Sequence, residues 1–186
     1  MIGEADGENK KKQQAIGICG TGMIDLVYEL RKHQMIDEHG TYSDLYFDTG
    51  YELAGKVKFT QNDIREIQMA KAAIAVGQKT LLKAAGMEAW QVKKVYLAGG
   101  MGTFLNVRAA VETGLVEKSF LPVAKAGGNT SLQGAVSYLK KTGQEQILEK
   151  DKLKEITEKM QVLMLADMPD FADAYISHMA LTEFKA

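Results

Sequence analysis

The feature that most constrains the fold is a pattern that occurs twice: a short apolar run, then a cluster of glycines, then helical periodicity. The first instance comprises the apolar run 15–19, the cluster Gly20–Gly22 and the helical pattern 23–33. The second comprises the apolar run 92–98 and the cluster Gly99–Gly102, followed by a further predicted helix. Glycine at such a junction permits unusual φ angles and leaves room for a close neighbour. The pattern therefore predicts strand–turn–helix units and an α/β fold.

A long helix is predicted between these two units. Thr60 can cap backbone N–H groups at its start, and Asp63 favours the positive end of the helix dipole. Apolar residues then recur at helical spacing until Gly86, which is predicted to end the helix. These apolar residues are Ile64, Ile67, Ala70, Ile74, Leu81 and Leu82. Small residues gather mid-helix at Ala70, Ala72, Ala73, Ala75 and Gly77, and such a face lets another backbone approach closely.

The remaining segments are shorter. Residues 35–59 combine turn signals with β-like pieces at 45–47 and 57–59, which predict a small hairpin or irregular strands. A Gly-Gly-Asn sequence precedes another predicted helix at 130–140. The segment 145–183 is predicted to be mostly helical, with a break near Pro169.

Composition excludes several classes of function. The chain has 186 residues, of which 46% are hydrophobic and 25% charged, and its net charge is -1. This is the profile of one ordinary soluble domain, with no bulk electrostatic attraction for nucleic acids or membrane surfaces. No apolar run is long enough to span a membrane, and the polar segment 1–14 lacks the apolar centre of a signal peptide. We therefore expect a flexible lead at 1–14 and a cytoplasmic location.

Few side chains suggest chemistry by themselves. The histidines His33, His39 and His178 lie far apart and show no metal-ligand spacing, so no metal site is predicted and the catalytic residues stay unknown. The lone cysteine, Cys19, cannot form an intramolecular disulfide, and we predict a small buried residue there. The segment Asp48–Gly50 is predicted to be a plain turn.

The two glycine clusters are the candidate binding sites. A helix that follows such a turn presents free N–H groups and the positive end of its dipole, both of which suit phosphate. Neither cluster has the form of a P-loop or of the dinucleotide-binding fingerprint. The pattern leaves two interpretations open, a ligand site or a purely steric use of glycine.

Longer motifs carry a resemblance. The strand end Val95–Gly102 resembles the adenosine motif of the superfamily containing acetate and sugar kinases, heat-shock chaperones and actin, and the helix 61–82 resembles its connecting helix. Residues 60–71, 17–25 and Gly128–Asn129 resemble the reductive activators of corrinoid proteins. Those enzymes use ATP to drive reduction of an inactive Co(II) corrinoid to Co(I). They serve O-demethylases or the corrinoid iron–sulfur protein of acetogenic bacteria.

The resemblance implies an α/β fold that is the second lobe of an actin-like ATPase (ribonuclease H-like). In that fold a mixed sheet is flanked by helices, here with a helical C-terminal tail. The implied domains are the flexible lead 1–14, a nucleotide-binding lobe at 15–143, and a helical extension at 144–186 packed on the same domain.

The resemblance also implies that ATP lies in a cleft between two lobes. The second glycine cluster would line the adenosine side, and the first would face the phosphates or ribose. Gln68 and Lys71, three residues apart on one helix face, would either reach the nucleotide or form a solvated polar face. The candidate cofactor-binding residues are Gly20, Thr21, Gly22, Gln68, Lys71, Gly99, Gly100, Met101 and Gly102.

The chain departs from that family in two respects. Its single cysteine does not match the four cysteines of the family's N-terminal [2Fe–2S] domain, and the two Asp-x-Gly-Thr phosphate segments are absent. We therefore expect a fragment that is inactive alone, with the [2Fe–2S] cluster and most phosphate and Mg²⁺ contacts in another part of the protein. The implied partners are a corrinoid protein, the nucleotide, and a second copy in a homodimer of the full-length protein.

Other functions stay open. An activator of 2-hydroxyacyl-CoA dehydratases shares the fold, and its glycine turn resembles Gly20–Gly22, but it needs cysteines for a bridging [4Fe–4S] cluster. A sugar or acetate kinase fits the first glycine cluster less well. A non-catalytic module that only dimerises or binds a partner is the third alternative.

Overall fold

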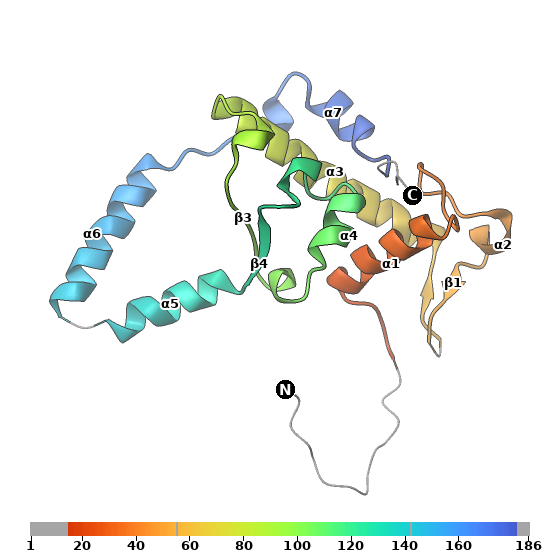
Figure 1. Ribbon diagram of the computed structural model, residues 1–186, viewed down its shortest axis with the longest axis horizontal. Coiled ribbons are helices and arrows are strands. Elements are labelled where there is room, and N and C mark those ends of the chain that lie inside the picture. Colours follow the sequence, from red (N-terminus) through yellow and green to blue (C-terminus); the bar gives the residue numbers. More distant parts are fainter. Residues whose placement is uncertain (1–14, 55, 142, 182–186) are drawn as a thin grey trace, which may run out of the picture.

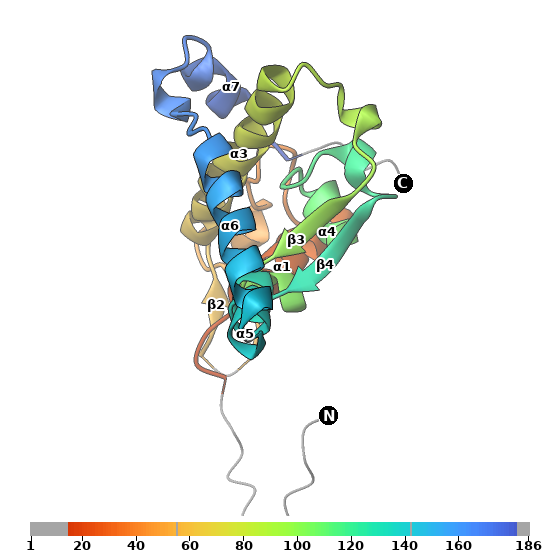
Figure 2. The same cartoon turned by 90° about the vertical axis from the view of Figure 1, so that its left-hand side faces the viewer.

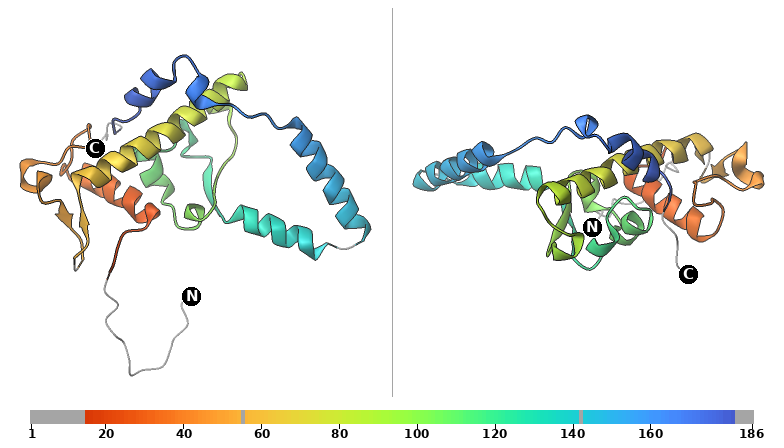
Figure 3. Two further views of the ribbon diagram at one scale, coloured as in Figure 1. Left: turned by 180° about the vertical axis from the view of Figure 1, so that it is seen from behind. Right: turned by 90° about the horizontal axis from the view of Figure 1, so that it is seen from above.

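The computed structural model describes residues 15–54, 56–141 and 143–181. The chain forms a body around the long helix α3 (Gln61–Ala84) and an arm of two helices, α5 (Thr130–Lys140) and α6 (Gln144–Lys159), that extends from it (Figure 1). The views from behind and from above show the same separation (Figure 3). From α6 the chain returns through the short helix η4 (Leu165–Asp167) to α7 (Phe171–Ser177), which packs against α3.

Helix α1 (Gly20–Lys32) buries one apolar face, formed by Ile24, Val27 and Leu30. The predicted helix at 23–33 is confirmed, and it already begins within the first glycine cluster. The prediction of a strand at 15–19 is wrong. No strand of the described residues pairs with this segment, and Ile16 is 99% exposed. The predicted burial of Cys19 is also wrong, because this residue is the exposed N-cap of α1.

Residues 35–59 form the predicted hairpin, with one correction. Strands β1 (Tyr51–Glu52) and β2 (Lys58–Phe59) pair antiparallel. The piece predicted as β-like at 45–47 lies instead in the single helical turn α2 (Asp44–Phe47). Tyr46 explains the difference, because its ring packs on two neighbouring tyrosine rings and its amide donates to the Ser43 carbonyl oxygen at 2.9 Å.

The Asp48–Gly50 segment connects α2 to β1 as the predicted turn. Gly50 has a φ of 69°. A Cβ atom at this position would lie 2.8 Å from the carbonyl oxygen of Phe59, so the turn and the strand β2 could not approach so closely with another residue.

Helix α3 matches its prediction at both ends. The Thr60 hydroxyl accepts from the Asp63 amide at 3.3 Å, and the Asp63 carboxylate accepts from the Thr60 amide at 2.7 Å, which makes a reciprocal capping box. The helix ends before Gly86, whose φ is 62°. Within the small-residue face Ala72 and Ala75 are buried, and a Cβ atom at Gly77 would lie 3.5 Å from Leu165. Near Gly77 the small-residue face therefore meets a side chain at ordinary van der Waals distance, and not the backbone that was predicted to approach closely there.

A pair of parallel strands follows α3, as Figure 2 shows. Strand β3 (Val95–Ala98) pairs with β4 (Ala124–Gly128). The short helix η1 (Ala89–Gln91) precedes β3, and η2 (Met101–Thr103), α4 (Val107–Glu112) and η3 (Lys118–Phe120) lie between the two strands. Strand β3 begins later than the predicted start at residue 92, because Val92 still donates to the Ala89 carbonyl oxygen as the C-cap of η1.

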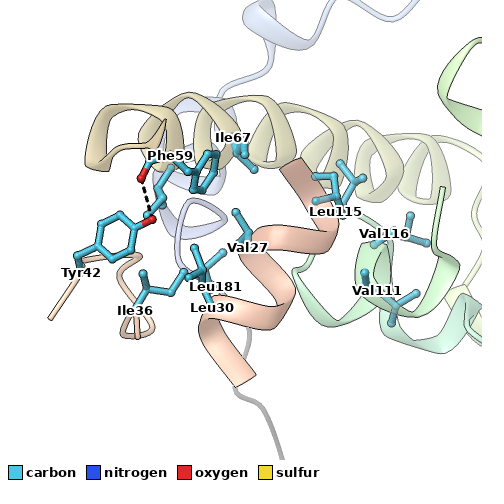
Figure 4. Packing of buried hydrophobic residues seen from close by; sticks show 14 of the residues in the cluster. Val27, Leu30, Ile36, Tyr42, Phe59, Ile67, Val111, Leu115, Val116 and Leu181 are labelled. Carbon is cyan, nitrogen blue, oxygen red and sulfur yellow. Dashed lines mark hydrogen bonds between the residues drawn. The ribbon is translucent and has the colours of Figure 1, made fainter. Parts of the chain in front are cut away.

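The core lies between α1, α3, α4 and the hairpin. Phe59, Ile36 and Leu181 gather on one side of α1, while Leu115 and Val111 lie on its other side (Figure 4). The Tyr42 hydroxyl donates to the Phe59 carbonyl oxygen at 2.9 Å across this core. Burial raises the pKa of Tyr42 to about 12, so the hydroxyl stays protonated as a donor.

The α/β class is confirmed, and the structure refines two predicted features. The strands of the described residues form two separate two-stranded sheets in place of one mixed sheet. In the predicted extension at 144–186, α7 lies on α3, whereas α6 has no buried residue. Helix α5, at the end of the predicted lobe, has no buried residue either. The predicted lead at 1–14 lies outside the described residues.

Candidate functional site

The carboxyl ends of β3 and β4 meet at one edge of the body. Glycine stands at both ends: β3 ends at Ala98 and is followed by Gly99, and β4 ends at Gly128, directly before the cap of α5. The Gly99 amide donates to the Gly128 carbonyl oxygen at 2.9 Å, so the two turns are joined by a hydrogen bond. Because α/β folds bind ligands outside the carboxyl ends of parallel strands, this edge is the candidate site.

The backbone of the turn after β3 requires glycine at two positions, whereas the third glycine faces open space. Gly99 has a φ of 100°, a conformation that L-residues rarely adopt. A Cβ atom at Gly102 would lie 2.3 Å from the Leu97 carbonyl oxygen, so no side chain fits there. A Cβ atom at Gly100 would meet nothing within 4 Å. Gly99 and Gly102 therefore shape the turn, whereas Gly100 faces open space that a ligand could occupy.

The turn after β4 joins the same edge. Gly128 has a φ of 66°, and the Asn129 side chain caps α5 by accepting from the Leu132 amide at 3.0 Å. Sequence reasoning noted this Gly-Gly-Asn signal before a helix but did not assign its residues to the site. Since Gly128 holds Gly99 through its carbonyl oxygen, this turn is part of the candidate site.

The first glycine cluster lies at the same lower edge in Figure 1, as the first turn of α1. The prediction of a separate turn before the helix is wrong, because Gly20, Thr21 and Gly22 are already helical. The position still presents free amides and the positive end of the α1 dipole. Helix α1 packs on α4, which follows the β3 turn in sequence, so both glycine clusters belong to one packed unit.

The exposed thiol of Cys19 lies at the same positive end of the α1 dipole. Its sulfur lies 3.3 Å from the Thr21 hydroxyl. The pKa of Cys19 is lowered, first by the hydrogen bond with the Thr21 side chain and then by the Gly22 backbone amide. Groups that stabilise a thiolate also suit other anions, so this end of α1 is chemically able to face phosphate.

Gln68 and Lys71 lie elsewhere. The two side chains are 4% and 2% exposed, so the interpretation as a solvated polar face is wrong. The structure gives them backbone partners: Gln68 donates to the carbonyl oxygens of His39 and Met179, and Lys71 to those of His178 and Ala180. They hold the C-terminal segment, whereas the seven other predicted site residues lie in the first turn of α1 and the turn after β3.

Among residues 15–54, 56–141 and 143–181, no group of three or more His, Cys, Asp or Glu side chains could hold a metal ion. Over the same residues, no helix combines the length and apolar character needed to cross a membrane.

Comparisons with known proteins agree on one group. The family described as "C-terminal domain of RACo the ASKHA domain" matches residues 3–186. The chain is 27% identical over 147 residues to the corrinoid activation enzyme RamQ of Eubacterium limosum, covering 66% of this chain and 25% of RamQ. A solved structure, a reductive activator for corrinoid, iron–sulfur protein, matches with a TM-score of 0.72 and 28% identity, covering 90% of this chain and 29% of that one. The chain thus spans between a quarter and a third of the length of these relatives.

Proposed function

The chain belongs to the RACo C-terminal ASKHA-domain family, and from this premise we propose that it is the ATP-binding part of a reductive activator of corrinoid proteins. The full activator would use ATP to drive reduction of a Co(II) corrinoid to Co(I) in a protein of methyl transfer. Both similar proteins carry names of this class, a corrinoid activation enzyme and a reductive activator. The target, an O-demethylase component or a corrinoid iron–sulfur protein, is part of the proposal.

The observation that carries the proposal is the convergence of glycine segments at the carboxyl edge of β3 and β4. The open space at Gly100 allows a flat nucleoside to lie against the backbone. The first turn of α1 offers amides for phosphate.

ATP, when bound, would supply binding free energy that differs between two conformations of the activator. This chain's own contribution is to hold the nucleotide in one position. Gly99 and Gly102 fix the turn after β3, and the Gly128 carbonyl oxygen ties it to β4. The α1 amides would orient the phosphates. Because α1 packs on α4 and α3, a shift of the α1 end would be passed to the body.

The described residues do not by themselves provide ligands for two further groups, Mg²⁺ and a [2Fe–2S] cluster. The described residues provide no side-chain cluster for Mg²⁺, and Cys19 is the one cysteine of the chain. We propose that the phosphates carry Mg²⁺ and that the [2Fe–2S] cluster belongs to another part of the activator. Gln68 and Lys71 are left out of the proposed nucleotide site because their donors are engaged with the C-terminal segment.

The alternative of a partner-binding module has its own support in the arm. Leu132 and Leu139 of α5 are 59% and 73% exposed, and no helix of the described body covers them. Such a surface suits contact with a corrinoid protein or with a second copy in a cytoplasmic homodimer. This function and nucleotide binding use different parts of the chain and can be tested separately.

The test of nucleotide binding is a thermal shift of the 186-residue chain with and without Mg-ATP, compared with Gly100→Val. The valine points into open space, so the variant should unfold at the wild-type temperature without ligand. A ligand at about 100 times its Kd adds about 2.7 kcal/mol, or about 5–10 °C for a chain of this size. The matched control is Ala172→Val, on an exposed position of α7 at the opposite edge.

The proposal expects a shift in wild type and in Ala172→Val that Gly100→Val loses. A shift retained in all three proteins would place the nucleotide away from the β3 turn. If no protein shifts at millimolar Mg-ATP, the chain does not bind ATP by itself, and the partner-binding alternative gains support.

A further inference from the structure

A polar stripe runs along one face of α3, next to two loops that are remote in sequence. Its members Gln61, Arg65, Gln68 and Lys71 are spaced so that they fall on one side of the helix. The loop 37–42 and the C-terminal segment 178–181 both lie on this stripe.

One amide group joins all three parts. The Gln68 Nε2 atom donates to the His39 carbonyl oxygen at 3.0 Å and to the Met179 carbonyl oxygen at 2.9 Å. The fit leaves no space, because a Cβ atom at Gly40 would lie 2.9 Å from the Gln68 side chain. The two loops also bond directly, since the Leu181 amide donates to the Glu38 carbonyl oxygen at 2.8 Å.

Lys71 fixes the C-terminal segment in an unusual way. Its Nζ atom donates to the carbonyl oxygens of His178 and Ala180, both at 2.6 Å. Among the described residues no carboxylate forms an ion pair with it. The carbonyl groups just beyond α7 attract a cation. Burial nevertheless lowers the pKa of Lys71 to about 8, because the charged form loses hydration in this place.

We infer that residues 178–181 form a clip that detaches from α3 together with residues 37–41 of the loop, as one unit, while the rest of the body, including the buried Tyr42, stays folded. Opening breaks the hydrogen bonds that Gln68 and Lys71 donate to the loop and the clip. It also breaks those that Gln61 and Arg65 donate to the loop. In return, the ammonium group and the carbonyl groups regain contact with water. Leu181 is the one apolar residue of the clip that is buried. Detachment therefore costs less than unfolding of the core, and it exposes a stripe of cationic and amide donors on α3. The inference does not depend on nucleotide binding.

The wild-type chain provides the first test, by amide hydrogen exchange followed residue by residue with NMR. The Leu181 amide donates from the clip to the Glu38 carbonyl oxygen and reports their separation directly. The Asp37 and Thr41 amides donate within the loop, and they lose protection when the loop, released from α3, unfolds. The proposal expects these three to share one opening free energy, below that of the buried Ile67 and Ala72 in α3. Exchange of all three at the α3 rate, or at three unrelated rates, would overturn it. This measurement needs no variant that might fail to fold.

A variant pair tests the role of the lysine. In Lys71→Met, the loss of two hydrogen bonds should speed exchange at Asp37, Thr41 and Leu181 together, by about tenfold or more. Amides of α4 should exchange as in wild type. Lys79→Met is the control, because Lys79 lies on the same helix, is exposed, and forms no ion pair among the described residues. If Lys71→Met changed Leu181 alone and left Asp37 and Thr41 protected, the two loops would not open as a unit.

Discussion

In the body, Val27, Phe59 and Ile64 have no exposed surface, whereas in the arm Leu132, Leu139 and Ile147 remain 59%, 73% and 61% exposed. Both regions are helical, so helix formation alone does not distinguish them. The body is stabilised by apolar contacts between elements distant in sequence. The arm is held by its own backbone bonds, by the Asn129 cap and by ion pairs along α6. Helices as short as the 11 residues of α5 are marginal without packing, so the two regions should respond differently to the same change.

The largest contrast is expected from truncating one large apolar side chain in each region. Phe59→Ala removes a fully buried ring and leaves a cavity, so it should lower the free energy of unfolding by about 3–5 kcal/mol. Leu139→Ala removes a side chain that already faces solvent, so it should change the free energy of unfolding by less than about 0.5 kcal/mol. Urea unfolding of both variants measures this. A cost of several kcal/mol for Leu139→Ala would show that the arm is packed in solution.

What the sequence could predict depends on whether an element is determined by residues close in the chain or by contacts with remote ones. The elements that carry local signals are found correctly: the Thr60 cap of α3, the end of α3 before Gly86, and, in the arm, the helix 130–140 after its Gly-Gly-Asn sequence. These features are set by residues within a few positions of one another. The glycines of the turn after β3 could also be named, because steric need for glycine is visible in the sequence.

What could not be predicted depends on neighbours remote in the chain. The run 15–19 has the composition of a strand, yet it has no strand partner among the described residues. Tyr46 reads as β-like but is drawn into a helical turn by the rings of Tyr42 and Tyr51. Gln68 and Lys71 have the spacing of a binding face, and only the fold shows that residues 178–181 cover them. Sequence spacing places such residues on a helix face without identifying their partners.

A second prediction concerns the pH dependence of stability, which reports the free-energy cost of burying the charged Lys71 side chain in the body. The pKa of Lys71 is lowered by burial from 10.5 to about 8. Between these values the unfolded chain binds more protons than the folded one, so stability rises as pH increases. From pH 7.5 to 9.5 the wild-type chain should gain about 2 kcal/mol relative to Lys71→Met. Urea unfolding of both proteins at the two pH values measures the difference. An equal response of both proteins would mean that Lys71 is hydrated in solution.

The smallest effect on stability is expected in the arm, where charges are exposed. Glu149 of α6 lies 3.4 Å from Lys141, which follows α5, and 3.3 Å from Lys152. The pKa of Glu149 is lowered, first by its hydrogen bond from Lys152 and then by the charge of Lys141. Exposed pairs of this kind contribute little to stability, so Glu149→Gln should leave the urea midpoint unchanged.

Loss of this pair should change the distance between α5 and α6, because Lys141 and Glu149 connect the two helices of the arm. Spin labels on α5 and α6 should give a broader distance distribution in Glu149→Gln than in wild type. Glu158→Gln is the control, since Glu158 pairs with Lys154 inside α6 and does not bridge the helices. A carboxylate with a lowered pKa stays charged while ordinary glutamates protonate, and its contribution is lost only as pH falls through that lowered value. The wild-type distribution should therefore stay narrow at mildly acidic pH and broaden only below the ordinary range of glutamate. A distribution that is equally broad in all three proteins would mean that this pair does not set the angle between the two helices of the arm.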